Sequence, residues 1–211
     1  MKMENKLKKY ALISLTDKSG VKELATALIN CGYSLVSTGN TAKVIQDSGM
    51  ECLEISSLTG FPEILGGRVK TLNPKVFGGI LARRDNTRDI EELLEHGIDL
   101  IDVVAVNLYD FSGASQKEDA TVADLVEKID IGGVSLIRGA AKNHKFVSIL
   151  TSPIQYPEFI ERLSNNNLDE EYRQYLAVEG FKVTAAYDSM ISRVLEEKIT
   201  GENTILSIFE P

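Results

Sequence analysis

Side chains that bind metals or form disulfides are scarce in this 211-residue sequence. Its two cysteines, Cys31 and Cys52, form no CxxC pattern and lie at no metal-ligand spacing, so we interpret them as small packing residues. The two histidines, His96 and His144, bring no set of partners that would complete a metal site. The sequence therefore predicts no bound metal.

Positive charge and long hydrophobic runs are also scarce. Lysine and arginine number 23 against 31 acidic residues, a formal net charge of −8, which argues against a broad nucleic-acid-binding surface. An acidic chain can still bind an anion through a local basic cluster or backbone N–H groups. No segment approaches the ~20 apolar residues of a membrane span, and the charged start resembles no signal peptide. We expect a cytoplasmic protein that binds neither nucleic acid nor membrane.

Short apolar runs typical of buried strands alternate with helix-like segments. The predicted strands are YALISL, YSLVST, ECLEI, DVVAVNLY and KFVSILTS. From Pro157 the chain is predicted to be helical, with a long helix from Asp169 to about Lys198. This alternation predicts an α/β fold, a mostly parallel sheet with helices on both faces. We expect one domain, in which a helical extension over residues 152–211 packs on an α/β core over residues 1–151.

Local signals predict where several of these elements begin and end. Ser19 is the expected N-cap of the first helix, and Gly32 is expected to end it. Thr121 and Asp124 resemble a capping box at the start of a helix reaching Ile129. Residues 56–74 contain three glycines and two prolines without a clear period, so we expect a mostly irregular, functional loop.

Two loops are candidates for binding a phosphate, because ligands of parallel sheets lie beyond the carboxyl ends of the strands. TGNT, residues 38–41, joins a strand to a helix and combines two hydroxyls, a glycine and a helix N-terminus. TDKSG, residues 16–20, supplies Lys18 after the neighbouring strand. A capped turn without a ligand is the alternative for TGNT alone, and the second loop beside it favours phosphate binding.

Further polar side chains cluster in short motifs. They are Arg68 and Lys70 in GGRVKTLNP, Asn107 and Tyr109 at the end of the DVVAVNLY strand, Asp130 in IDIGG, and Lys142 in RGAAKNH. Each has a plain structural alternative: a solvated basic loop, a half-buried tyrosine, a turn aspartate and an exposed lysine. Together they favour an anion-binding α/β domain with Lys, Tyr and Asp near the phosphate, and they name no reaction.

The order of the motifs is far more specific than any one of them. SLTDKSG, VSTGNTAKVIQDSGM, ISSLTGFPEILGGRVKTLNPKVFGGILARR, VVAVNLYDF, IDIGGVSLIRGAAKNH and VTAAYDSMIS follow one another from about Tyr10 to about Leu195. This order resembles the amino-terminal inosine monophosphate (IMP) cyclohydrolase domain of the bifunctional purine-biosynthesis protein. In that family the domain is fused to an aminoimidazole-carboxamide ribotide (AICAR) transformylase.

The resemblance implies a methylglyoxal-synthase-like fold, and ring closure of 5-formamidoimidazole-4-carboxamide ribotide, a purine nucleotide precursor, without metal or organic cofactor. It implies that Thr16, Lys18, Thr38, Gly39, Asn40 and Thr41 hold the 5′-phosphate and ribose. It places Arg68, Lys70, Thr71, Asn107, Asp130 and Ile131 around the base. It assigns catalysis to Lys70, Tyr109, Asp130 and Lys142.

For the mechanism we expect Lys70 and Tyr109 to stabilise the formyl oxygen. Asp130 and Lys142 are expected to act as a coupled acid and base, with their individual assignments open. Two departures from the family pattern affect the site: Asn40 stands where glycine is typical, and Asn73 stands where histidine is frequent. We therefore give Asn73 no catalytic role.

The expected partners are a second copy of the chain, as a homodimer, and an AICAR transformylase, either as a fused domain absent from this sequence or as a separate protein. Two other functions remain as alternatives. Methylglyoxal synthase would need the phosphate loops and a carboxylate base. A nucleotide-binding regulatory module, as in carbamoyl-phosphate synthetase, would need the phosphate loops without the four catalytic side chains.

Overall fold

The computed structural model describes residues 7–117 and 119–201 and contains a five-stranded, all-parallel sheet. The strand order is β3-β2-β1-β4-β5, so β1 is the central strand, with β2 and β3 on one side of it and β4 and β5 on the other. The strands are β1 (Lys9–Ser14), β2 (Ser34–Ser37), β3 (Leu53–Glu54), β4 (Leu100–Val106) and β5 (Ser148–Leu150). The central strands β1 and β4 are almost wholly apolar and buried, as strands covered on both faces must be.

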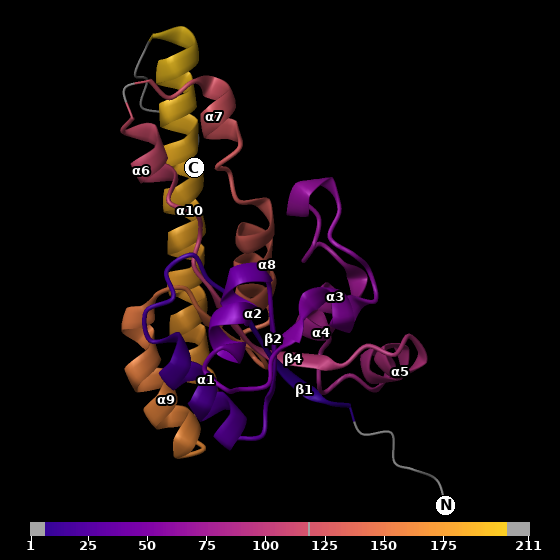
Figure 1. Ribbon diagram of the computed structural model, residues 1–211. Helices are drawn as coiled ribbons and strands as arrows, with labels where there is room; N and C mark the ends of the chain where they lie inside the picture. Colours follow the sequence, from indigo (N-terminus) through magenta and orange to yellow (C-terminus); the bar gives the residue numbers. More distant parts are fainter. Residues whose placement is uncertain (1–6, 118, 202–211) are drawn as a thin grey trace, which may run out of the picture.

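Helices cover both faces of this sheet (Figure 1). They are α1 (Val21–Asn30), α2 (Gly39–Gln46), α3 (Ile55–Thr59), α4 (Pro74–Leu81), α5 (Thr87–Glu95), α6 (Phe111–Ser115), α7 (Val122–Val126), α8 (Ile131–Lys142), α9 (Tyr156–Ser164) and α10 (Glu170–Thr200), with 3-10 turns η1 (Leu65–Gly67) and η2 (Pro153–Gln155). Helix α1 packs against β2 and α9, whereas α4 and α8 pack against β4 and each other. The predicted α/β fold is confirmed.

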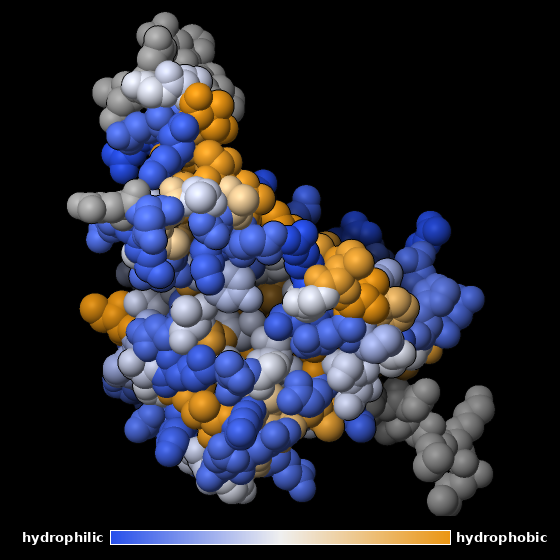
Figure 2. Space-filling view, turned by 45° about the horizontal axis from the view of Figure 1, so that its top comes forward, coloured by the Kyte–Doolittle hydropathy of each residue, from blue (hydrophilic) through white to orange (hydrophobic). Residues whose placement is uncertain are grey.

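The long helix α10 lies along α8 and β5, and its second half extends beyond the sheet (Figure 1). There α6 and α7 pack on it around Phe111, Leu125 and Tyr187, which form a hydrophobic cluster separate from the main core. We call α6, α7 and this half of α10 the arm. Hydrophobic residues are also exposed along the arm in the space-filling view (Figure 2). No helix within the described ranges is long and apolar enough to cross a membrane.

Some local predictions agree with the structure. Gly32 follows α1 at φ 84°, a left-handed conformation that favours glycine. Thr121 and Asp124 form the predicted capping box of α7. The predicted long helix from Asp169 is α10, with Asp169 as its N-cap and Thr200 as its last residue.

Other local predictions are wrong. Ser19 does not cap α1, because its hydroxyl donates instead to the Asp17 carboxylate at 2.6 Å and Gly20 occupies the N-cap. The helix after Thr121 ends at Val126 rather than Ile129, and the ECLEI strand shrinks to two residues. Residues 56–74 are nevertheless mostly irregular, as predicted, with short helical turns in α3 and η1. The last ten residues of the predicted extension, 202–211, lie outside the described residues.

Candidate active site

A cavity of about 790 Å³ opens at the carboxyl ends of β1, β2 and β4. Its walls come from the 60–72 loop, the start of α2, the end of α7 and the start of α8. The predicted site residues that line it are Thr16, Lys18, Thr38, Gly39, Asn40, Thr41, Arg68, Lys70, Thr71, Asn107, Tyr109, Asp130 and Ile131. The fold thus brings together every predicted site residue except Lys142.

The start of α2 provides backbone N–H groups at the bottom of this cavity. Its N-cap, Thr38, makes no side-chain cap, and its hydroxyl shares a 2.9 Å hydrogen bond with that of Ser14. The buried Thr41 hydroxyl accepts from the Leu15 N–H at 3.1 Å and donates to the Leu15 carbonyl at 2.9 Å. Thr41 therefore braces β1 against α2 rather than presenting its hydroxyl to a ligand. The uncapped helix N-terminus is the group that suits a phosphate.

Asn107 has a role that its place at the strand end did not reveal. Its side-chain oxygen accepts from the backbone N–H groups of Thr16 at 2.6 Å and Asp17 at 3.0 Å. Its amide nitrogen donates to the Asp17 carbonyl at 2.7 Å. These three bonds hold the 16–20 loop in place and use the amide that was expected to face the base.

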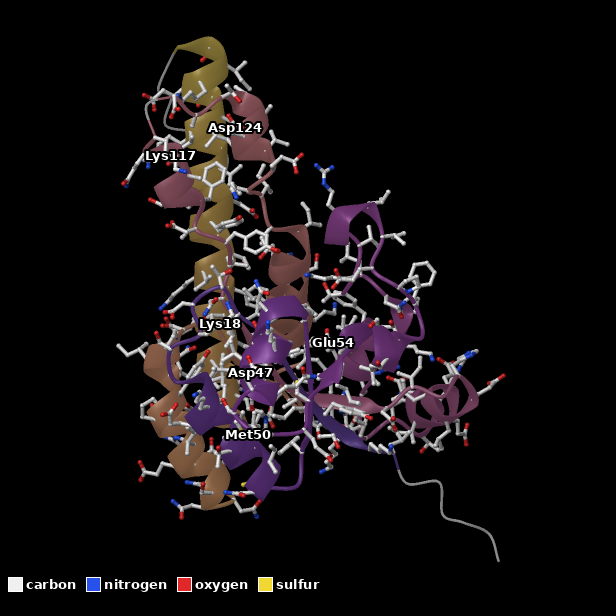
Figure 3. The ribbon with its side chains drawn as sticks, viewed as in Figure 1. Lys18, Asp47, Met50, Glu54, Lys117 and Asp124 are labelled. Carbon is white, nitrogen blue, oxygen red and sulfur yellow. The ribbon has the colours of Figure 1, made fainter. Side chains whose placement is uncertain are left out.

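Lys18 extends from that loop at the end of β1. Its ammonium group donates to the Thr16 carbonyl at 3.1 Å. In the stick view it lies beside α2, in the same part of the molecule as the cavity (Figure 3). A cation beside an uncapped helix N-terminus is a suitable partner for a phosphate.

Asp130 is the N-cap of α8 and lies at the opposite wall. Its carboxylate accepts from the Gly133 N–H at 2.7 Å. A side chain at Gly133 would lie 2.5 Å from that carboxylate and 2.8 Å from Leu108, and one at Gly132 would lie 2.7 Å from the Thr71 hydroxyl. The double glycine of IDIGG is therefore what allows the start of α8 to approach Thr71 and the capping carboxylate closely.

The environment of Asp130 makes its ionised form less favourable than it is in water. Burial raises the pKa of its carboxyl, and this is opposed by hydrogen bonds from the N–H groups of Gly133 and Tyr109 and by the charge of Lys70. A carboxylate with a raised pKa is a stronger base than an exposed one. The Tyr109 side chain beside it is 47% exposed and lines the same cavity.

Two ion pairs of the 60–72 loop, in the wall of the cavity, were not predicted from the sequence. The Lys70 ammonium lies 3.7 Å from the carboxylate of Glu63 in the same loop. Arg68 pairs with Glu127, at the end of α7, and so joins the 60–72 loop to the arm. Both acidic residues line the cavity. No sequence spacing could indicate the second pair, because its members come from segments 59 residues apart.

Lys142 lies outside the cavity, contrary to the prediction. It is exposed at the last residue of α8, whereas Asp130 precedes the first. At 1.5 Å per residue, twelve helical residues separate the two positions by about 18 Å. A coupled acid–base pair of Asp130 and Lys142 within one chain is therefore incompatible with this structure.

Comparison with known proteins places this arrangement in a family. A model of the MGS-like domain matches residues 20–135, which include the TGNT loop and Asp130. The chain belongs to the MGS-like domain family. A second model, of the AICARFT/IMPCHase bienzyme, matches residues 140–209, in the region of α9 and α10.

The relatives of this chain include bifunctional enzymes of purine biosynthesis. Over 97% of the chain, it is 46% identical to the bifunctional purine biosynthesis protein PurH of Bacillus thuringiensis (strain Al Hakam) and 45% identical to that of Bacillus anthracis (strain CDC 684 / NRRL 3495). The chain spans about 40% of the length of these relatives. Among solved structures, the crystal structure of ForH matches with a TM-score of 0.80 and 33% identity, covering 90% of this chain and 98% of that one.

Proposed function

We propose that this chain is an IMP cyclohydrolase, which closes 5-formamidoimidazole-4-carboxamide ribotide to IMP with loss of water. The observation that carries the proposal is one cavity that joins an uncapped helix N-terminus to Lys70, Tyr109 and Asp130. The kinship with bifunctional purine-biosynthesis enzymes supports it.

The 5′-phosphate would bind at the start of α2. The backbone N–H groups of Gly39 and Asn40 and the ammonium of Lys18 would neutralise its charge. Asn107 would contribute indirectly, because it holds the loop that carries Lys18. With the phosphate bound there, the imidazole ring of the substrate would lie near α8, where the cavity is lined by Lys70, Asp130 and Ile131.

Ring closure forms a bond between the carboxamide nitrogen and the formyl carbon. Asp130 would take a proton from the carboxamide nitrogen as it attacks. The formyl oxygen would gain negative charge, and the Lys70 ammonium, the Tyr109 hydroxyl and the first N–H groups of α8 would stabilise it. Positioned donors of this kind each contribute about 10²–10³-fold to kcat.

Loss of water completes the reaction. Asp130 returns the proton to the formyl oxygen, which becomes a hydroxyl group. This hydroxyl leaves as water by taking the single proton of the formamido nitrogen, and a C=N bond forms between that nitrogen and the former formyl carbon. The condensation takes place within one molecule, so no oxidant or group donor is consumed. Holding both reacting groups in one conformer supplies a large part of the acceleration.

The decisive experiment is to incubate the purified chain with formylated AICAR and follow the absorbance of IMP. We expect turnover by the unchanged chain and little by Asp130→Asn. Asp47→Asn is the matched control, because Asp47 lies at the opposite end of α2 from the cavity (Figure 3). Tight binding of IMP without turnover would refute the cyclohydrolase and favour a nucleotide-binding regulatory module.

Two partners also belong to the proposal. We propose that the chain forms a homodimer, which light scattering at several concentrations tests directly. We propose that it works with an AICAR transformylase, because the bifunctional relatives are longer than this chain. The chain by itself should not formylate AICAR, and transformylase turnover by the purified chain would contradict that division of labour.

A further inference from the structure

The VTAAYDSMIS motif of α10 places one tyrosine directly behind the candidate active site. Tyr187 is 5% exposed and comes 57 residues after Asp130. Its hydroxyl accepts a hydrogen bond from the backbone N–H of Asp130 at 2.9 Å and donates to the Lys128 carbonyl at 3.2 Å. The side chain therefore binds the turn that leads into α8 at two points.

The ring of Tyr187 contacts the segment that follows Tyr109. It packs edge-on against Phe111, with ring centroids 6.3 Å apart and an interplanar angle of 73°. Phe111 is fully buried and comes two residues after Tyr109. One side chain thus contacts both the segment that carries Tyr109 and the turn that carries Asp130.

This contact matters because Tyr109 and Asp130, two of the proposed catalytic residues, line the same cavity. Tyr187 contacts both segments that carry these side chains, so a movement of either segment changes the relation between the two. The N–H of an N-cap residue precedes the helix and receives no support from the helical hydrogen-bond ladder. For Asp130 that support comes from the Tyr187 hydroxyl.

We infer that Tyr187 is a positioning residue for ring closure, which holds Asp130 and Tyr109 in their catalytic relation from outside the cavity. Tyr187 does not line the cavity, so it touches no reacting atom. This role rests on the proposed function. The arm would then contribute to catalysis, because Tyr187 belongs to α10.

Tyr187→Phe tests the inference, because it removes one oxygen and keeps the ring against Phe111. We expect kcat to fall about tenfold with KM nearly unchanged, since positioning affects the transition state and the phosphate anchor is untouched. The matched control is Tyr172→Phe, a tyrosine of the same helix with the same 5% exposure that does not line the cavity. It should keep both constants.

A second measurement does not depend on activity. Amide hydrogen exchange at Asp130 should be slow in the unchanged chain and faster in Tyr187→Phe, and unchanged in Tyr172→Phe. Wild-type kcat in a folded Tyr187→Phe, or fast exchange at Asp130 in the unchanged chain, would overturn the inference. An unchanged chain that does not turn over formylated AICAR would instead refute the proposed function, and the positioning role with it.

Discussion

Replacing Asp130 with asparagine should remove catalysis while leaving the fold almost unchanged. Asparagine caps helices about as well as aspartate, and its side-chain oxygen can still accept from the Gly133 N–H. It cannot take a proton. Loss of a positioned general base lowers kcat by about 10²–10⁴-fold, whereas loss of a cap lowers stability by about 1 kcal/mol.

The pKa of Asp130 adds a sign to the stability change. Because burial raises the pKa in the folded state, the ionised carboxylate disfavours folding at pH values above the raised pKa. Asparagine removes that cost at neutral pH but gives the Gly133 N–H a weaker, uncharged acceptor. The two effects oppose one another, so we expect Asp130→Asn to unfold within about 1 kcal/mol of the unchanged chain at pH 7.

Two assays check the reasoning: steady-state turnover of formylated AICAR and thermal unfolding, each with Asp130→Asn and Asp130→Ala. Alanine loses both cap and base, so it should match asparagine in activity and melt about 2–4 °C lower. The same raised pKa predicts that kcat of the unchanged chain falls with decreasing pH through a value above the ordinary pKa of an aspartate. Retention of more than a tenth of kcat by Asp130→Asn would refute the base role.

The remaining predictions concern Lys142, which lies outside the cavity, and Lys18 and Asn107, which line it. Lys142→Ala should keep kcat and KM and change stability by about 0.5 kcal/mol or less, because Lys142 is exposed at the far end of α8; a hundredfold loss of kcat would contradict this. Lys18→Ala should raise KM about tenfold and lower kcat less, as a remote phosphate contact does. Asn107→Ala should also raise KM, because three hydrogen bonds to the 16–20 loop are lost; steady-state kinetics on the folded variant decides it.

The sequence alone determined the α/β class and predicted most of the polar residues that the fold gathers in one cavity. Strands such as YALISL and DVVAVNLY were predictable because an apolar run of that length can only be buried. The carboxyl ends of parallel strands meet at one edge, so the loops after them could be placed together without coordinates. The order of the motifs then identified the resemblance to the cyclohydrolase domain, which the family match supports.

Only the tertiary structure decided what several of these residues do. Thr41 and Asn107 were predicted as ligand contacts. The Thr41 hydroxyl is instead hydrogen-bonded to backbone 26 residues away, and the Asn107 side chain to backbone 90 and 91 residues away. Lys142 was expected to act with Asp130 in the mechanism that follows from the resemblance, but the two lie at opposite ends of α8. The VTAAYDSMIS motif did not indicate the role of Tyr187, because the partners of its hydroxyl lie 57 and 59 residues back in the chain. Local patterns report propensity and burial, whereas these roles depend on which distant backbone groups a side chain meets.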